Sequence, residues 1–533
     1  MTRNLCCLVL LLSASTFVDA SGFTFRKVVE TGDDAEGING FFDSIVLEPV
    51  INNNGVVAFS CRLFGTEELE QDNEALIIAD ESGWHIVALE GQPAPNGDGV
   101  YGSLFPIDQP VFYWPAINDN DQVIAKVGYI NFTTPFSHSG LISATLEGVS
   151  SVARLSEATP AGTSLFDTLP GAFDGINTRG TTAFIAGTIA GGSDLGEGVF
   201  RWSNGSLEQV IHTGDVLPGT SETIIDIVGT RPGLGGTDTM TFKVLAENAE
   251  GVARERMLLA SATGIVILST EGEEAPGGGT YTEMGLGAGV TAMNSVGGVA
   301  FRAGISNPPF FETRVMRGSA SGLSAIAVED SPSPDGDGSF QTFLDPQLND
   351  AGHVALVTAF EFEAGFATDI GIIRDVGSGW EVVLRTGYPL PAGTGTMGEA
   401  NLGTPQMNAS GTVAAIVGIA DTVADVALVY SRAGEPAVEI LRSGDVLAGR
   451  EVASLVMPFN NDPGGRSSIN DAGAVVFVAY FEDGTQGVYV AEAAGTQPVP
   501  AVSAWGVTVM ALLILIFGTI CFLSAQRARW SDA

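Results

Sequence analysis

Short apolar runs alternate with clusters of Gly, Asn, Asp and Pro along almost the whole chain. In one stretch the runs are Thr181–Ala186, Gly198–Trp202, Leu207–His212 and Glu222–Val228, and the turns between them contain Asn204–Gly205 and Pro218–Gly219. Apolar runs of this length, bounded by residues that favour turns, are typical of β-strands. The pattern therefore predicts an all-β fold with four short strands in each unit.

The first repeated phrase is N-x-x-G-x-x-A-F. Complete copies begin at Asn52, Asn177 and Asn294, looser copies begin at Asn118, Asn349, Asn408 and Asn470, and an eroded copy lies near Gly235–Phe242. The residues of this phrase are expected to form a tight turn followed by a buried strand, because Asn and Gly adopt left-handed backbone conformations readily.

The second repeated phrase is G-[DE]-x-x-P-G, complete at Gly214–Gly219 and Gly272–Gly277. It recurs with the same period as the first phrase, about 58 residues, and both phrases give eight units. Two phrases that share one period predict stacked supersecondary units rather than unrelated domains.

The strand after each Asn-Gly turn carries apolar residues on both faces. Val57 and Phe59 point one way and Ala58 points the other, so both faces of the sheet should be covered. A unit of about 58 residues buries little surface by itself. The units are therefore expected to pack against one another, as the blades of a β-propeller do.

The phase of the repeat predicts how such a ring closes. The exported chain begins partway through a unit with Phe23–Glu30, and it ends with the complementary part, Asn470–Val490. The N-terminal strand should complete the last blade beside Gly487–Ala491, which removes exposed sheet edges. The preferred fold is an eight-bladed β-propeller, with a seven-bladed ring or an open β-solenoid as alternatives.

Both ends of the chain have the composition of membrane-targeting segments. Arg3 precedes an apolar stretch, and Val18–Ala20 suits signal-peptide cleavage. Near the C-terminus an uncharged apolar stretch long enough to cross a bilayer precedes Arg527 and Arg529. The predicted organisation is a signal peptide at 1–20, the propeller at 21–495, a linker and sorting motif at 496–504, a transmembrane helix at 505–524 and a basic cytoplasmic tail at 525–533.

The residues that lead into the C-terminal apolar segment resemble the IPTL-CTERM type of bacterial protein-sorting signal. The matching residues are Pro500, Ser503, Trp505 and Gly506. This resemblance implies processing by an exosortase-like membrane peptidase, whereas the alternative is an ordinary single-pass anchor. Residues 22–495 resemble the tandem-repeat NxxGxxAF-containing surface proteins, a resemblance that implies a location at the cell envelope or surface but no activity.

Acidic residues far outnumber basic ones, with 62 Asp and Glu against 23 Lys and Arg and a net charge of −39. Such a chain repels nucleic acid, which is therefore not an expected partner. Acidic turns can also bind Ca²⁺ through oxygen ligands. Asp98, Asp335 and Asp337 lie in equivalent loops of two units and are the weak candidates, with solvated turns as the alternative and no other cofactor expected.

Motifs for catalysis are missing from the sequence. It contains no H-E-x-x-H, C-x-x-C, G-x-S-x-G or P-loop pattern, and its four histidines fall in different units. Cys61 is the single cysteine of the predicted propeller, so it has no partner there for a disulfide. An enzyme is therefore the less favoured interpretation.

Two functions from different classes remain open. The preferred one is a surface-displayed propeller that binds or scaffolds polysaccharide or other surface proteins. Exposed aromatic residues would support it, and the candidates are Tyr113–Trp114, Trp202 and Phe310–Phe311, with Asn307–Phe311 the best candidate for an exposed apolar loop. Packing between blades is the favoured interpretation of these aromatic residues. The alternative is an extracellular hydrolase that acts on glycans or esters, because a pair of carboxylates far apart in sequence can meet in a propeller.

Overall fold

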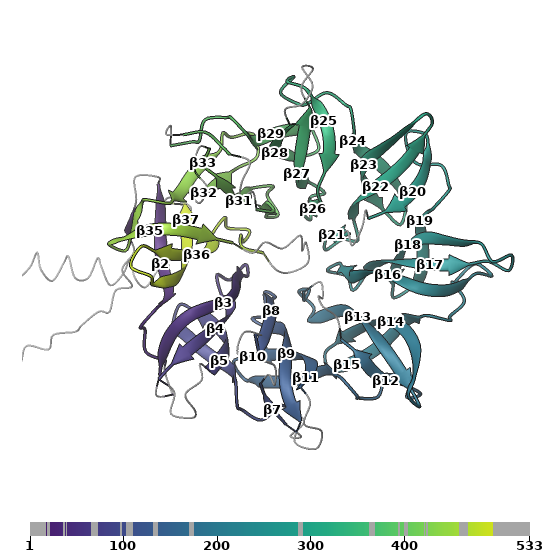
Figure 1. Ribbon diagram of the computed structural model, residues 1–533, viewed down its shortest axis with the longest axis horizontal. Helices are drawn as coiled ribbons and strands as arrows, with labels where there is room; N and C mark the ends of the chain where they lie inside the picture. The colour runs from purple at the N-terminus through teal and green to yellow at the C-terminus, as the bar shows by residue number, and fades with distance from the viewer. Residues whose placement is uncertain are drawn as a thin grey trace, which may run out of the picture.

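The computed structural model contains eight antiparallel sheets arranged as blades around one axis (Figure 1). The structure describes residues 17–18, 22–35, 38, 40–65, 73–95, 99–102, 110–131, 137–169, 175–285, 291–361, 368–392, 395–398, 403–420, 422, 425–457 and 467–493. Over these residues the fold is all-β, and the eight-bladed propeller is confirmed over both the seven-bladed ring and the open solenoid.

The first four blades follow one another along the chain. Blade 1 contains β3 (Phe41–Ile51), β4 (Val57–Phe64), β5 (Asn73–Asp80) and β6 (Gly83–Leu89). Blade 2 contains β7 (Gly99–Tyr101), β8 (Phe112–Ile117), β9 (Val123–Asn131), β10 (Ser137–Thr145) and β11 (Gly148–Arg154). Blade 3 contains β12 (Leu165–Thr168), β13 (Thr181–Ala190), β14 (Ser193–Ser203) and β15 (Ser206–His212), and blade 4 contains β16 (Thr223–Leu234), β17 (Met240–Glu247), β18 (Ala253–Ser261) and β19 (Gly264–Thr270).

Blades 5 to 7 continue the series. Blade 5 contains β20 (Thr280–Met284), β21 (Ala292–Met293), β22 (Val299–Asn307), β23 (Phe310–Ser319) and β24 (Gly322–Val328). Blade 6 contains β25 (Ser339–Phe343), β26 (Gln347–Leu348), β27 (Val354–Glu361), β28 (Thr368–Asp375) and β29 (Trp380–Arg385). Blade 7 contains β30 (Gln406–Met407), β31 (Val413–Gly418), β32 (Val426–Ser431) and β33 (Val438–Arg442).

Blade 8 is assembled from both ends of the chain. Its strands lie in the order β34 (Val446–Leu447), β35 (Arg450–Val456), β36 (Val475–Phe481), β37 (Gln486–Ala493), β2 (Phe23–Glu30) and β1 (Phe17–Val18). Strand β2 pairs with β37 in antiparallel register from Phe23 opposite Ala493 to Glu30 opposite Gly487. The predicted closure of the ring by the N-terminal strand is therefore confirmed.

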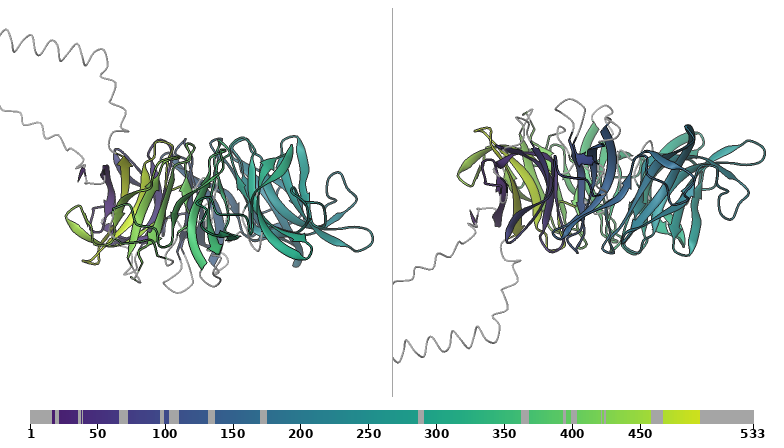
Figure 2. Two further views of the ribbon diagram at one scale, coloured as in Figure 1. Left: turned by 90° about the horizontal axis from the view of Figure 1, so that it is seen from above. Right: turned by 90° about the horizontal axis from the view of Figure 1, so that it is seen from below.

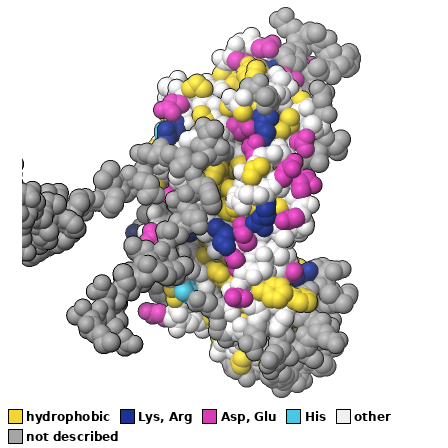
Figure 3. Space-filling view, turned by 90° about the vertical axis from the view of Figure 1, so that its left-hand side faces the viewer, with side chains coloured by type: hydrophobic (Ala, Val, Ile, Leu, Met, Phe, Trp, Pro, Cys, Tyr) yellow, Lys and Arg dark blue, Asp and Glu magenta, His cyan; other side chains and the backbone are white. Residues whose placement is uncertain are grey.

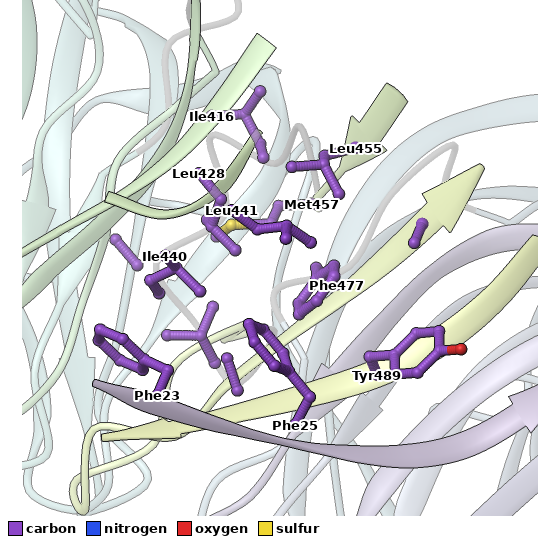
Figure 4. Close-up of a cluster of buried hydrophobic side chains, with 14 of the residues drawn as sticks. Phe23, Phe25, Ile416, Leu428, Ile440, Leu441, Leu455, Met457, Phe477 and Tyr489 are labelled. Carbon is purple, nitrogen blue, oxygen red and sulfur yellow. The ribbon is translucent and has the colours of Figure 1, made fainter. Parts of the chain in front are cut away.

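Apolar side chains fix the closing strand against its neighbours. Phe23 and Phe25 of β2 lie in one buried cluster with Phe477 of the same blade and with Leu428 and Ile440 of blade 7 (Figure 4). The rings of Phe25 and Phe477 meet edge to face, with centroids 6.2 Å apart. Packing as well as backbone pairing therefore holds the two chain ends together.

The sequence units and the blades are out of phase by one strand. The run Glu222–Val228, which the sequence pattern grouped with the third unit, lies in β16 and pairs with β17 of blade 4. The strand after each G-[DE]-x-x-P-G phrase thus begins the next blade. Each phrase is a linker, in which the amide of its first residue donates to the following blade, as Gly214 N does to Ile224 O at 2.8 Å.

The strand that follows each Asn-Gly turn is buried on both faces, as predicted. Val57 and Phe59 of β4 belong to the core shared with blade 8, whereas Ala58 belongs to the core shared with blade 2. The side chains of these three residues are fully buried. Each blade therefore contributes one face to the core that it shares with each of its two neighbours. For this reason no repeat has to bury its apolar faces by itself.

The views along the side of the ring show a flat body (Figure 2). Where the closing blade faces the viewer, Asp and Glu side chains are spread over the surface with Lys and Arg side chains among them (Figure 3). Within the described residues, no helix has the length and apolar character that crossing a membrane requires. The predicted transmembrane helix at 505–524, the sorting residues Pro500, Ser503, Trp505 and Gly506, most of the signal peptide at 1–20, and Asp98 lie outside the described residues.

Candidate functional site: a ring of asparagines and the pocket at its centre

The Asn-x-x-Gly turns lie at the centre of the propeller, where each one links two blades. In blade 7 the Oδ1 atom of Asn408 accepts hydrogen bonds from the amides of Ser410 at 3.1 Å and Thr412 at 3.0 Å. Its Nδ2 group donates to the carbonyl oxygen of Asn470 in blade 8 at 3.0 Å. One side chain therefore both shapes its own turn and binds the next blade.

This link recurs at seven of the eight seams between blades, including the seam between blade 8 and blade 1. The donors and their carbonyl acceptors are Asn52 to Asn118, Asn118 to Asn177, Asn177 to Gly235, Asn294 to Asn349, Asn349 to Asn408, Asn408 to Asn470, and Asn470 to Asn52. Blade 4 has Gly235 in the asparagine place. The Gly235 carbonyl oxygen accepts the hydrogen bond from blade 3, but glycine has no side chain that could donate to blade 5.

Two blades have Asp instead of Gly at the fourth place of the turn. Asp121 and Asp238 both adopt the left-handed conformation, with φ of 57° and 61°. Their carboxylates accept a second hydrogen bond from the asparagine of the preceding blade, at 2.7 Å from Asn52 and 2.9 Å from Asn177. The substitution costs backbone strain but adds a contact between blades.

The asparagine ring surrounds a pocket with a cavity volume of about 240 Å³. An apolar residue precedes each ring position and lines the pocket, namely Ile51, Ile117, Ile176, Leu234, Met293, Leu348, Met407 and Ile469. The residue after each ring position lines it as well, namely Asn53, Asp119, Thr178, Gly236, Ser295, Asp350, Ala409 and Asp471. The pocket thus has an apolar layer, an amide layer and a polar rim.

The three rim carboxylates are held by backbone amides of the preceding blade. Asp119 accepts from Asn53 N at 2.9 Å, Asp350 from Ser295 N at 2.7 Å and Asp471 from Ala409 N at 2.8 Å. They are the charged groups among the described residues that line the pocket, where neither a basic nor an aromatic side chain occurs. The rim can therefore accept hydrogen bonds from hydroxyl groups or cations and repels anions.

The calcium candidates are engaged in a hydrogen-bond network at the start of blade 6. Nη1 of Arg385 lies 3.1 Å from Oδ2 of Asp335 and 2.7 Å from the carbonyl oxygen of Asp337, and Ser333 and Tyr388 also donate to the Asp335 carboxylate. Burial opposes ionisation, but these hydrogen bonds outweigh it and lower the pKa of Asp335 to about 2. A cation at this place would compete with a buried arginine.

No three His, Cys, Asp or Glu side chains of the described residues are grouped so that they could hold a metal ion. His138 stacks on Tyr129, whereas His353 contacts Asn349 of the ring. In β15, Nε2 of His212 lies 2.7 Å from the hydroxyl of Thr188, and Nδ1 lies 2.7 Å from the Thr213 carbonyl oxygen. Thr188 is fully buried, so its hydroxyl is not accessible, and both ring nitrogens of the half-buried His212 have partners.

One Asp-Ser-His cluster has the residue types of a hydrolase triad but not its geometry. The hydroxyl of Ser82 lies 3.1 Å from Nε2 of His85 and donates to Oδ1 of Asp80 at 2.6 Å. Asp80 therefore contacts the serine and the same imidazole nitrogen, 3.7 Å away, and not the opposite nitrogen that a triad requires. The cluster shapes the turn between β5 and β6.

The predicted apolar loop is exposed. Phe310 and Phe311, at the tip of the β22–β23 hairpin, are 70% and 76% exposed. Trp202, by contrast, is buried between blades, and Tyr113 and Trp114 lie beside Lys126. Of these aromatic residues, Phe310 and Phe311 are thus the most exposed, whereas Tyr113 and Trp114 are half-buried.

A family model described as "Family of unknown function (DUF7453)" matches residues 12–124 and 106–503. No curated protein matches the chain by sequence. Solved structures with similar folds include the Dos1 propeller, with 8% identity over 85% of this chain and 94% of that one and a TM-score of 0.36. An oligogalacturonate lyase in complex with manganese has 9% identity over 90% and 96% of the two chains and a TM-score of 0.34.

A six-bladed lectin from the fungus Aleuria aurantia is also similar, with 7% identity over 61% of this chain and 93% of the lectin and a TM-score of 0.26. Identities and scores at this level assign no activity. The site must therefore be interpreted from its own residues.

Proposed function

Since the chain belongs to DUF7453, a family of unknown function, we propose from its own geometry that it is a binding or scaffolding propeller of the cell surface. The observation that carries the proposal is the central pocket, which side-chain hydrogen bonds across seven of the eight seams hold in shape. A pre-formed concave site with a few convergent polar groups is typical of ligand binding.

The chemistry of the rim defines the ligand class. Asp119, Asp350 and Asp471 offer carboxylate oxygens, while Thr178 and Ser295 add hydroxyl groups. Such a rim suits a hydroxyl-rich ligand, such as a neutral polysaccharide, or a basic group on another surface protein. The rim contains no histidine, cysteine or lysine among its described residues that could act as a nucleophile or base.

The test is binding without turnover. The full-length chain is screened against arrays of polysaccharides and surface proteins, together with the triple variant Asp119→Asn, Asp350→Asn, Asp471→Asn, which keeps an oxygen acceptor at each place. The proposal predicts that wild type binds, that the variant loses affinity at unchanged melting temperature, and that the polysaccharide stays intact. Product release from the polysaccharide would favour the hydrolase alternative, and equal binding by the variant would exclude the central pocket.

The proposed location is supported by the terminal segments of the sequence. The apolar stretch at 505–524, the residues Pro500 to Gly506 and the basic tail after them suit sorting and anchoring of an exported body. Mass spectrometry of the mature protein from cell fractions tests this. A C-terminus near the sorting motif is expected if an exosortase-like peptidase acts, whereas a surface protein that retains Arg527 would indicate an ordinary anchor.

A further inference from the structure

Three of the seams between blades are bridged by an arginine of the third strand, and the seam between blades 8 and 1 by Arg26 of β2, which donates to Gly55 O at 3.0 Å. Arg201, Arg317 and Arg374 occupy the same place in the third strand of blades 3, 5 and 6, each opposite the alanine of the N-x-x-G-x-x-A-F phrase. In each case Nη1 donates to the carbonyl oxygen of the residue at the glycine place of the next blade. These acceptors are Asp238 at 3.1 Å, Gly352 at 2.8 Å and Gly411 at 2.7 Å.

Blade 7 has a tyrosine at this place. Tyr430 pairs with Ala414, the alanine of the phrase, and therefore corresponds to the bridging arginines. Its ring is 4% exposed and is held edge to face by Phe23, with centroids 5.4 Å apart. Its hydroxyl points at the glycine of the next turn, because a Cβ atom on Gly473 would lie 2.5 Å from it. Among the described residues this hydroxyl makes no hydrogen bond.

The seam between blades 7 and 8 contains a groove where the arginine is missing. Its cavity volume is about 320 Å³, at the lower end of the range of ligand pockets. Tyr430, Gly473, Asp471 and Glu435 line it, together with Arg432. The Arg432 guanidinium lies 5.7 Å from the centre of the Tyr430 ring, its side chain is 43% exposed, and Nη1 is 3.8 Å from the Glu435 carboxylate.

We propose that this groove binds an arginine side chain of a partner protein beside Tyr430, so that its guanidinium supplies the bridge that Arg201, Arg317 and Arg374 make in the other seams. The acceptors are the Gly473 carbonyl oxygen, the Tyr430 hydroxyl, and the carboxylates of Asp471 and Glu435. The groove itself contains the carboxylates of Asp471 and Glu435 and the guanidinium of Arg432. Its net charge is therefore negative, which complements a cation. The inference rests on the proposed binding function and names one partner chemistry for it.

The groove adjoins the central pocket, since Asn408 and Asp471 line both. A basic segment of a partner could therefore reach from the groove to the rim. A carboxylate outside both cavities supplies the control. Asp471 accepts Ala409 N at 2.8 Å and Asp483 accepts Thr485 N at 2.9 Å, but only Asp471 lines the groove.

The probe is a blocked pentapeptide with a central arginine, titrated calorimetrically into the full-length chain. The peptide in which citrulline replaces arginine has nearly the same shape but no charge. We expect the arginine peptide to bind about tenfold or more tightly than the citrulline peptide. Equal affinity of the two peptides, or no binding by either, overturns the inference without any variant that could misfold.

Variants then locate the site. In Tyr430→Arg the introduced side chain should itself occupy the groove. The variant should therefore have a higher melting temperature and should not bind the arginine peptide. Asp471→Asn should weaken binding severalfold, whereas Asp483→Asn should leave it unchanged. Binding that survives Tyr430→Arg in a folded protein would place the arginine elsewhere and overturn the inference. If arginine peptides fail but polysaccharide or surface protein still binds, the inference fails and the proposed function stands.

Discussion

The side-chain amide of Asn470 donates to the backbone carbonyl of Asn52 at 3.3 Å, although 418 positions separate the two residues. This hydrogen bond joins blade 8 to blade 1 at the axis, while β2 and β37 join the chain ends within blade 8. The ring is thus closed twice, by side chains at its centre and by backbone pairing within the last blade.

A substitution in the asparagine ring can separate the role of the side chain in its own turn from its role in the contact with the next blade. In Asn408→Asp the turn keeps its oxygen acceptor, but a carboxylate oxygen replaces the amide that donates to Asn470 O. Because the site is buried, the change should lower the free energy of unfolding by about 1–3 kcal/mol. Chemical denaturation of the variant checks this value.

Asn248 supplies the control. It accepts the amides of Glu250 at 3.1 Å and Val252 at 3.0 Å, as a ring asparagine does, but it lies in the exposed hairpin between β17 and β18. Asn248→Asp should therefore change the free energy of unfolding by less than about 0.5 kcal/mol. Equal changes in the free energy of unfolding at the two positions would mean that the hydrogen bond between blades adds nothing to stability.

The closing strand can be tested through its packing. Phe25 is 3% exposed in the core between blades 7 and 8, so Phe25→Ala should destabilise the protein by about 3–5 kcal/mol. Phe310→Ala removes a ring that is mostly exposed and should have little effect. A Phe25→Ala variant as stable as wild type would show that β2 does not belong to the core.

Burial raises the pKa of the Cys61 thiol, and the nearby Glu74 carboxylate adds to the effect. The thiolate is the reactive form, so Cys61 should resist alkylation at pH 8 until the protein unfolds. Peptide mass spectrometry after labelling, with and without denaturant, distinguishes it from the other cysteines. Rapid labelling of Cys61 in the native protein would contradict the burial of β4.

The hydrogen bonds of the Asp335 carboxylate predict that the stability of the protein falls at low pH. Because folding lowers the pKa of this carboxyl to about 2, its contribution is fully present above about pH 4 and is lost as pH falls toward 2. Asp335→Asn should remove this part of the acid sensitivity and destabilise the protein at neutral pH. In Asp337→Asn the carbonyl oxygen that binds Arg385 is retained, so its acid profile should follow that of wild type.

The architecture was predictable because the repeat leaves a local signal. Val57, Ala58 and Phe59 show by their alternation that both faces are buried, and the incomplete unit at Phe23–Glu30 shows which strand closes the ring. The assignment of Glu222–Val228 to the third unit was wrong because sequence spacing does not reveal which neighbour a strand pairs with.

The site was less predictable. The asparagines were expected to form turns, but their Nδ2 bonds join residues about 60 positions apart, and only the ring geometry brings these together. Tyr430 could have been found by aligning the third strands, where three other blades have arginine. Packing between blades was the favoured interpretation of Phe310 and Phe311 and was wrong, because both lie at the tip of a hairpin.

Amide hydrogen exchange of residues 23–30 in the native protein tests the closed ring most directly. These residues pair with Gly487–Ala493, so we expect both segments to exchange together and only as slowly as the whole fold opens. Exchange of residues 23–30 at the rate of an unpaired chain, while Gly487–Ala493 stays protected, would contradict it.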